Sequence, residues 1–176
     1  MKPLIRHAVV LHAAILLVAA AAPAFAQTAA GGLPDTGRVQ VTWQDPTQFS
    51  EIHLAANKRR ALEGDWVRQL ALYIQRTTDR HLPAGQRMQV AIEDVKRAGE
   101  RRGVGEGVPV VRSVSPPSIR LKVVRTDTYG RVVDQGERTL EDPSVLGGPT
   151  RSRGSDPLVF EKRLVDGWLD AEFPSK

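Results

Sequence analysis

The chain contains no cysteine among its 176 residues, and aromatic residues make up only 5% of it. The absence of cysteine excludes a disulfide framework, a thiolate metal site, a cysteine nucleophile and a lipid anchor on a cysteine side chain. The few aromatic residues are not interleaved with basic ones, as they are in many proteins that bind nucleic acid. The fold must therefore be held by an apolar core alone, and we expect no nucleic-acid partner.

Residues 1–26 have the three parts of a secretory signal peptide. Lys2 and Arg6 give a basic start, residues 8–22 form an apolar run, and Ala24-Phe25-Ala26 provides a cleavage site of small residues. The run is too short for a membrane-spanning helix, which needs about 20 residues. We therefore expect cleavage after Ala26, export to the periplasm, and a mature protein that does not span the membrane.

The predicted mature chain is mildly basic. Its formal net charge falls from +5 to +3 on loss of Lys2 and Arg6, because no acidic residue leaves with them. This excess permits weak attraction to an anionic component of the envelope. The basic cluster at residues 58–60 is most simply a solvated surface, with anion binding as the alternative. Residues 27–37 lack periodicity, so we expect a disordered lead-in to a single domain over residues 38–176.

Alternating apolar and polar residues predict β-strands in three segments, residues 38–44, 88–94 and 119–125. A turn then leads into a hairpin partner at residues 131–140, where Gly136 indicates a bulge. Residues 108–114 contain a proline, which restricts a strand there to the edge of a sheet. The glycine-rich residues 97–107 and the polar residues 143–156 are typical of loops.

Two further segments have the periodicity of amphipathic helices. Residues 66–81 form the first, with Asp65 as the expected N-cap. Pro157 lies just inside the second, where its missing N–H is tolerated. Residues 49–62 are expected to be helical in part. The apolar residues that should form one core are Val41, Trp66, Leu70, Ile74, Val90, Leu121, Val165, Trp168 and Leu169.

The order of elements is strand, helix, strand, edge strand, hairpin, helix. Each long strand has one apolar and one polar face, so the sheet is covered on one side only. The helical crossover makes the first two strands parallel. These patterns predict an α+β two-layer sandwich, in which a mixed sheet of four to five strands carries two helices on one face.

Several short motifs occur in order along the chain: Val41-Thr42-Trp43-Gln44-Asp45-Pro46 with Phe49, Leu82-Pro83-Ala84-Gly85-Gln86, Val90-Ala91-Ile92-Glu93-Asp94-Val95, Pro116-Pro117-Ser118-Ile119-Arg120-Leu121, Leu140-Glu141-Asp142, and Phe160-Glu161-Lys162 with Trp168. This ordered set resembles the domain of unknown function 3016 family over roughly the whole predicted mature chain. The resemblance implies an exported bacterial protein of unassigned activity. The family usually has Asp-hydrophobic-Asp-Leu-Ala-Gly after the second strand. Here Lys96 replaces the second acid, which argues against a metal site in this chain.

Three acidic residues form the candidate site. Asp45 and Asp94 end the first two long strands, and parallel pairing places both at one edge of the sheet, where open α/β sheets commonly bind ligands. With Glu100 they are candidates for an oxygen-rich metal site or an acid–base pair. The alternative is that each aspartate caps a turn.

Glu161 falls within the apolar stripe of the final helix. A buried lone carboxylate is unfavourable by on the order of several kcal/mol, so it would need a partner such as an arginine from a loop. The alternative is an exposed position in the first turn, where an acidic residue complements the helix dipole. Either position makes Glu161 structural.

The open face of the sheet is the candidate partner surface. Gln89, Glu93, Arg120 and Lys122 alternate with core residues and should point away from both helices. These patterns favour a non-enzymatic periplasmic protein, without a cofactor, that binds or assists another envelope component. The competing function is a metal-assisted hydrolase that uses the three acidic residues.

Overall fold

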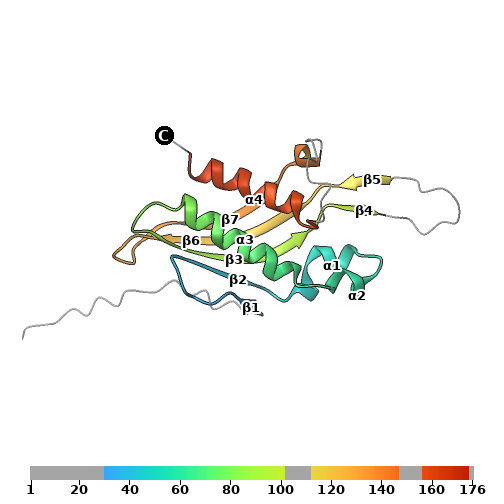
Figure 1. Cartoon of the computed structure of the whole chain (residues 1–176), viewed down its shortest axis with the longest axis horizontal. Coiled ribbons are helices and arrows are strands. Elements are labelled where there is room, and N and C mark those ends of the chain that lie inside the picture. The colour runs from blue at the N-terminus through green and yellow to red at the C-terminus, as the bar shows by residue number, and fades with distance from the viewer. Residues whose placement is uncertain (1–29, 102–111, 147–155, 175–176) are drawn as a thin grey trace, which may run out of the picture.

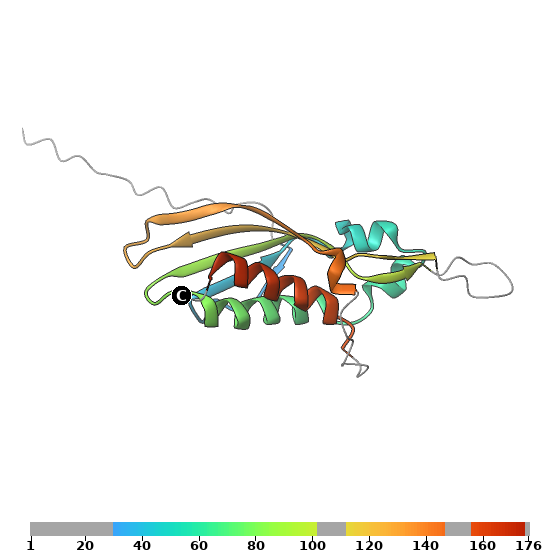
Figure 2. The same cartoon turned by 90° about the horizontal axis from the view of Figure 1, so that it is seen from above.

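The computed structural model describes residues 30–101, 112–146 and 156–174. These residues form a five-stranded sheet with two long helices packed on one face, as Figures 1 and 2 show. A separate two-stranded arm extends beyond one end of the sheet. The predicted α+β sandwich, with a mixed sheet and both long helices on the same face, is confirmed.

The strands of the sheet, in chain order, are β1 (Gly31–Gly32), β2 (Val39–Trp43), β3 (Arg87–Lys96), β6 (Ser118–Thr126) and β7 (Val132–Glu141). Their spatial order is β1-β2-β3-β6-β7. The β2–β3 pair is parallel, with Val39 opposite Met88, because a helix carries the chain back between these strands. The remaining neighbours are antiparallel. β1 and β7 therefore form the two edges.

The helices are α1 (Ser50–Leu54), α2 (Lys58–Leu62), α3 (Trp66–His81) and α4 (Val159–Glu172), with short 3₁₀ turns η1 (Pro46–Gln48) and η2 (Pro143–Leu146). α3 has the predicted bounds, although the side chain of Asp65 makes no capping hydrogen bond. Its C-terminal end is held by Arg38, which donates to the carbonyl oxygens of Asp79, Leu82 and Pro83. Pro157 precedes α4 rather than lying within it, because Asp156 accepts a hydrogen bond from the Leu158 N–H and forms the turn first.

One apolar core lies between the sheet and the two long helices. Its members include the predicted residues Val41, Trp66, Leu70, Ile74, Val90, Leu121, Val165 and Leu169, with Trp168 partly buried against them. The strand residues alternate with half-buried or exposed ones, so the period of two places one face of β2, β3 and β6 on the helices. The predicted facing of these strands and helices is confirmed.

The arm corrects two predictions about the middle of the chain. β4 (Gly99–Arg101) lies within the segment expected to be a loop, and it pairs with β5 (Arg112–Ser115) rather than with the main sheet. The reason is that the β3–β6 pairing continues past the end of the sheet, from Lys96 opposite Ser118 to Gly99 opposite Ser115. The expected edge strand is thus one half of a two-stranded ribbon.

Two smaller corrections concern the sheet edges. The irregularity in the β6–β7 pair lies between Arg125 and Thr126, whereas Gly136 pairs regularly with Val123. The expected disordered lead-in contains β1, and Leu33 in the same segment is buried in the core. Glycine permits β1, because a Cβ at residue 31 would collide with the indole ring of Trp43.

Candidate functional site

Asp45 lies at the predicted edge of the sheet, directly after β2. It is exposed, and its Oδ1 accepts a hydrogen bond from the Thr47 N–H at 2.9 Å, which caps η1. Hydrogen bonds from Thr47 hold the pKa of Asp45 below its ordinary value. The carboxylate thus has the local turn-capping geometry that was the alternative to ligand binding.

Asp94 lies within β3, paired with Arg120 and two residues before the strand ends, and not at the end of the strand as predicted, because the β3–β6 pairing continues to Lys96. Its two oxygens accept hydrogen bonds from the Ser50 N–H at 2.6 Å and the Ser50 hydroxyl at 2.7 Å, which attach the start of α1 to the sheet. Glu100 belongs to β4, and its side chain lies outside the described part of the structure. Within the described residues, no three His, Cys, Asp or Glu side chains group to hold a metal ion. Because the side chain of Glu100 is not among those described, the structure does not test the candidate metal site, against which Lys96 argues in the sequence.

The residues predicted for the open face lie on the two central strands. Gln89 and Arg120 are exposed, and Arg120 forms an ion pair with Glu93 at 3.8 Å. Lys122 is half-buried opposite Ala91. Val124 alternates onto this face and is only 4% exposed, and it is not part of the core cluster beneath the helices. The open face is therefore not uniformly polar.

Glu161 is buried, with 1% of its surface exposed. Its Oε1 accepts a hydrogen bond from the Ala98 N–H at 2.6 Å, while Oε2 has no hydrogen-bond partner among the described residues. Arg97, the kind of partner we expected, instead binds Glu51 with an N–O distance of 2.9 Å. Burial raises the pKa of Glu161 above its ordinary value. The side chain thus attaches α4 to the chain just after β3.

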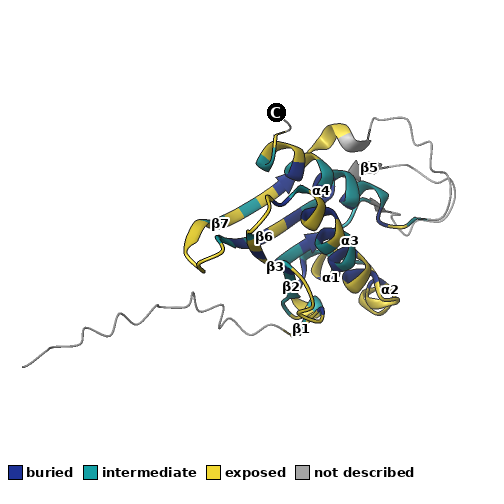
Figure 3. Cartoon of the chain, turned by 60° about the vertical axis from the view of Figure 1, so that its left-hand side comes forward, coloured by how far each residue is buried: buried dark blue, intermediate teal, exposed yellow. Residues whose placement is uncertain are grey.

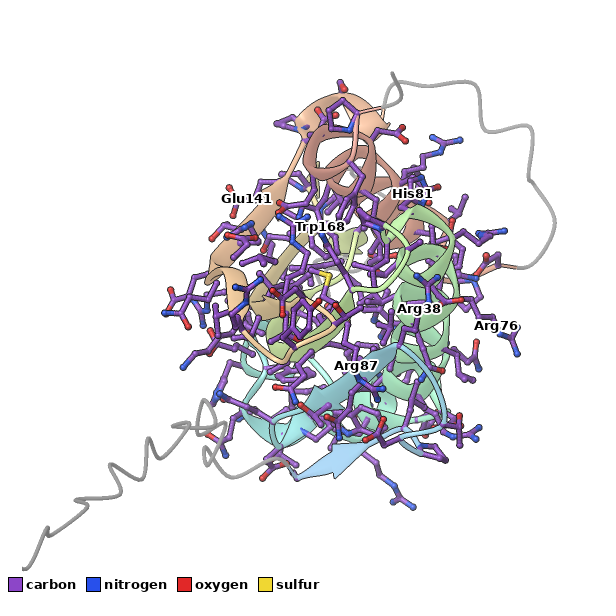
Figure 4. All side chains as sticks on the ribbon, turned by 90° about the vertical axis from the view of Figure 1, so that its left-hand side faces the viewer. Arg38, Arg76, His81, Arg87, Glu141 and Trp168 are labelled. Atoms are coloured by element: carbon purple, nitrogen blue, oxygen red, sulfur yellow. The ribbon has the colours of Figure 1, made fainter. Side chains whose placement is uncertain are left out.

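A groove lies between α4 and the free edge of β7, and we assign it as a candidate site. Its volume is about 400 Å³. Figure 3 shows that β7 is exposed along much of its length, and Figure 4 shows Glu141 and Trp168 on the same side of the molecule, away from Arg38 and Arg87. The groove is lined by Arg138, Thr139, Leu140, Glu141, Asp142, Arg163, Leu164, Gly167 and Trp168.

The groove has an apolar base and a fixed polar side. Leu140 and Leu164 are 5% and 4% exposed, and Trp168 packs against the core beside them. Glu172 accepts hydrogen bonds from the Trp168 Nε1 at 3.3 Å and from the guanidinium of Arg138 at 3.0 Å. These bonds raise the pKa of Arg138 and lower that of Glu172. Arg138 and Glu172 therefore both stay charged across the physiological pH range. Their hydrogen bonds hold the side chains of Arg138 and Trp168, which line the groove, in place.

Gly167 provides open space on the helix side of the groove. It is exposed in the interior of α4, and a Cβ built there would meet no atom within 4 Å. A glycine within a helix is destabilising by about 0.5–1 kcal/mol relative to alanine. Helix stability therefore does not favour glycine at this position.

The sequence predictions did not include this groove. Two sequence features were relevant: residues 131–140 form the last strand and have no later strand to pair with, and Gly167 interrupts an amphipathic helix. Neither feature shows that α4 lies beside β7. That placement depends on how the helices share the face of the sheet, where α3 lies over β2 and α4 contacts β6 and β7.

Among the described residues, no helix combines the length and the apolar character that a membrane crossing requires. Neither a curated protein nor a solved structure matches the chain. Residues 37–171 match a protein family described as Protein of unknown function (DUF3016), which confirms the resemblance seen in the ordered motifs. Because this match spans most of the chain, the protein belongs to the DUF3016 family.

Proposed function

We propose that the protein is exported to the periplasm and acts there as a non-enzymatic accessory protein that binds another envelope component. The signal-peptide pattern of residues 1–26 supports export. The binding site is the groove between β7 and α4, and the ligand is an extended segment of a partner polypeptide. The observation that carries this proposal is the edge strand β7, whose ten residues pair on one side only within the described part of the sheet.

An unpaired strand edge offers a row of backbone N–H and C=O groups to a second strand. Recognition by strand addition uses these groups for affinity and uses adjacent pockets to read alternate side chains of the peptide. The opposite edge of the sheet is only two residues long, so it offers little room for addition. β7 is therefore the better of the two edges for a peptide.

The groove beside β7 supplies the pocket that strand addition requires. Alternate side chains of an added strand point to one face of the sheet. On the helix side they would meet the apolar base formed by Leu140, Leu164 and Trp168. Glu137 and Arg138 place charges along the edge, which discourages indiscriminate association of the kind that exposed edges invite. We therefore expect a segment with apolar residues at alternate positions.

In-cell crosslinking tests the proposal. A photoreactive residue replaces Arg163, which is partly exposed on α4 and lines the groove. In a second protein the photoreactive residue replaces Gln89 on the open face. We expect the probe at position 163 to capture one envelope protein through a discrete peptide. The capture should be abolished by Gly167→Trp, which fills the groove, but kept by Gly167→Ala, whose single methyl group meets open space.

Three outcomes would contradict the proposal. Capture from the probe at position 89 but not from the probe at position 163 would move the binding surface to the open face. Equal capture by the Gly167→Trp and Gly167→Ala proteins would show that the groove is not used. Recovery of the chain from the cytoplasm with its original N-terminus would contradict export.

A further inference from the structure

The short helices α1 and α2 present a basic surface that the groove does not use. Lys58, Arg59 and Arg60 are all exposed on α2. None of their three side chains forms an ion pair or hydrogen bond with another residue of the described chain. Elsewhere, arginines such as Arg97 and Arg138 are bound to carboxylates. This cluster therefore keeps its charge available for an external partner.

Two large apolar side chains are exposed on the same pair of short helices as these cations. Leu62 on α2 is 39% exposed and Leu54 on α1 is 52% exposed. Leu62 lies four residues after Lys58 and three after Arg59, and these are the spacings that bring side chains together on a helix surface. Leu54 lies two residues from the buried Ile52, about 200° around α1, so it faces away from the core. The basic surface thus includes exposed leucines.

Contacts with the core hold this surface in place. Ile52 and Ala61 are the buried residues of α1 and α2. The Trp66 Nε1 donates to the carbonyl oxygen of Ala61 at 3.1 Å, and the Asn57 side chain caps α2 through the Arg60 N–H at 3.0 Å. The outward side chains take no part in these contacts, so they can be substituted without removing what fixes the helices.

Nearby acidic residues only partly offset the positive charge. Glu51 on α1 is engaged by the backbone N–H and the guanidinium of Arg97. Glu63, which follows α2, is exposed and is the nearest acidic residue in sequence to the three cations. Three free cations against this one free carboxylate leave a positive excess on the surface.

We infer that the α1–α2 surface docks on an anionic lipid bilayer. Lys58 and Arg59, on the side of α2 that carries Leu62, contact the phosphate groups of the lipid headgroups. Arg60 adds positive charge within the range of the surface potential. Leu54 and Leu62 enter the boundary between headgroups and acyl chains. Positive charge alone would suit any polyanion. The exposed leucines favour a bilayer, because combined basic and apolar contact is the mode by which surface helices bind membranes.

This inference does not rest on the proposed function. Figures 1 and 3 both show α1 and α2 on the side of the molecule away from β7, so a docked protein would leave the groove accessible to a partner. Bilayer docking and peptide binding are therefore separable, and variants in one surface serve as controls for the other.

Vesicle co-sedimentation tests the inference. The protein as purified from cells is mixed with vesicles of equal parts phosphatidylglycerol and phosphatidylcholine, or of phosphatidylcholine alone. Each cation near an anionic surface contributes about fivefold in partitioning, so the triple variant Lys58→Gln, Arg59→Gln, Arg60→Gln should bind the anionic vesicles ~100-fold more weakly. Leu54→Ser with Leu62→Ser should weaken binding by at least about tenfold. Vesicles without phosphatidylglycerol should not bind.

A matched variant separates this surface from net charge. Arg76→Gln, Arg80→Gln and Arg87→Gln remove the same number of charges from α3 and β3, and binding should fall by less than about threefold, because these residues would stay outside the contact. An equal loss in the two triple variants would overturn the inference. So would unchanged binding in the leucine variant, which would indicate a general polyanion surface. Gly167→Trp, which alters the groove alone, should bind vesicles as the wild type does.

Discussion

The buried carboxyl group of Glu161 allows a test of the structure through pH. Glu161→Gln keeps the oxygen that accepts the Ala98 N–H but removes the ionisation. Burial raises the pKa of Glu161 above its ordinary 4.5, so the folded chain keeps a proton on this group where the unfolded chain has lost it. The stability that this proton contributes is present below about pH 4.5 and is lost as the pH rises through the raised pKa.

The magnitude follows from the surroundings of the side chain. Near pH 4 both side chains are neutral and nearly equal in size, so we expect the free energies of unfolding to agree within about 1 kcal/mol. At pH 8 the wild type must either ionise a buried group with one unpartnered oxygen or hold its proton against the solvent. The amide nitrogen of the glutamine variant would lack a partner as well, but a neutral polar atom in this position is unfavourable by only about 1–3 kcal/mol, whereas a buried charge is unfavourable by more. The glutamine variant should therefore be more stable than the wild type at pH 8 by at least about 1 kcal/mol.

Urea unfolding followed by tryptophan fluorescence, repeated from pH 4 to pH 8, measures this difference. Asp45, Asp127 and Asp156 have lowered pKa values and make stability rise with pH, but both proteins share them, so subtraction isolates residue 161. Glu161→Ala is the control, because it leaves the Ala98 N–H unpaired and opens a cavity. It should be destabilised by at least about 2 kcal/mol at every pH. A constant difference between wild type and Glu161→Gln across the series would refute the burial argument.

Three further predictions concern packing. Leu70→Ala and Leu121→Ala, at sites that are 0% exposed, should each lower the free energy of unfolding by about 2–5 kcal/mol in the same assay. Losses within experimental error at both sites would mean that the helices pack elsewhere. Gly167→Ala should raise stability by about 0.5–1 kcal/mol, since its methyl group meets open space. A lower stability would mean that the added methyl group meets another atom in the groove. Gly31→Ala should reduce hydrogen-exchange protection in β1, because its Cβ would collide with an indole ring. Unchanged protection would contradict that contact.

The elements that the sequence predicted well are those in which burial follows a regular period. Val41, Val90 and Leu121 alternate with polar residues along their strands. The apolar residues pack against the helices, and the polar residues lie on the other face of the sheet. α3 has the predicted bounds because its apolar stripe ends just before Leu82-Pro83, and a proline there also stops the helix. The long elements could therefore be predicted from the local sequence alone, without knowing which elements pack against them.

The missed elements depend on contacts between distant residues. β1 consists of two glycines, which carry no periodicity. It can pair with β2 because residue 31 has no Cβ, which leaves room for the indole ring of Trp43. Glu161 is buried because the Ala98 N–H is available to it, and that pairing joins residues 63 positions apart. The same holds for the candidate site. Asp45 and Asp94 were placed at one sheet edge by strand direction, whereas the groove required the position of α4 over β7.

The parallel pairing of β2 with β3 constrains the order in which the chain can fold. β6 and β7 are joined by a short turn and can pair locally, within microseconds for an isolated hairpin. Val39 must instead wait for Met88, because the intervening α3 has to fold back before the two strands meet. The strand that comes first in the chain is therefore among the last to join the sheet. A chain that enters a compartment with its N-terminus first would keep this strand unpaired until the centre of the sheet had followed.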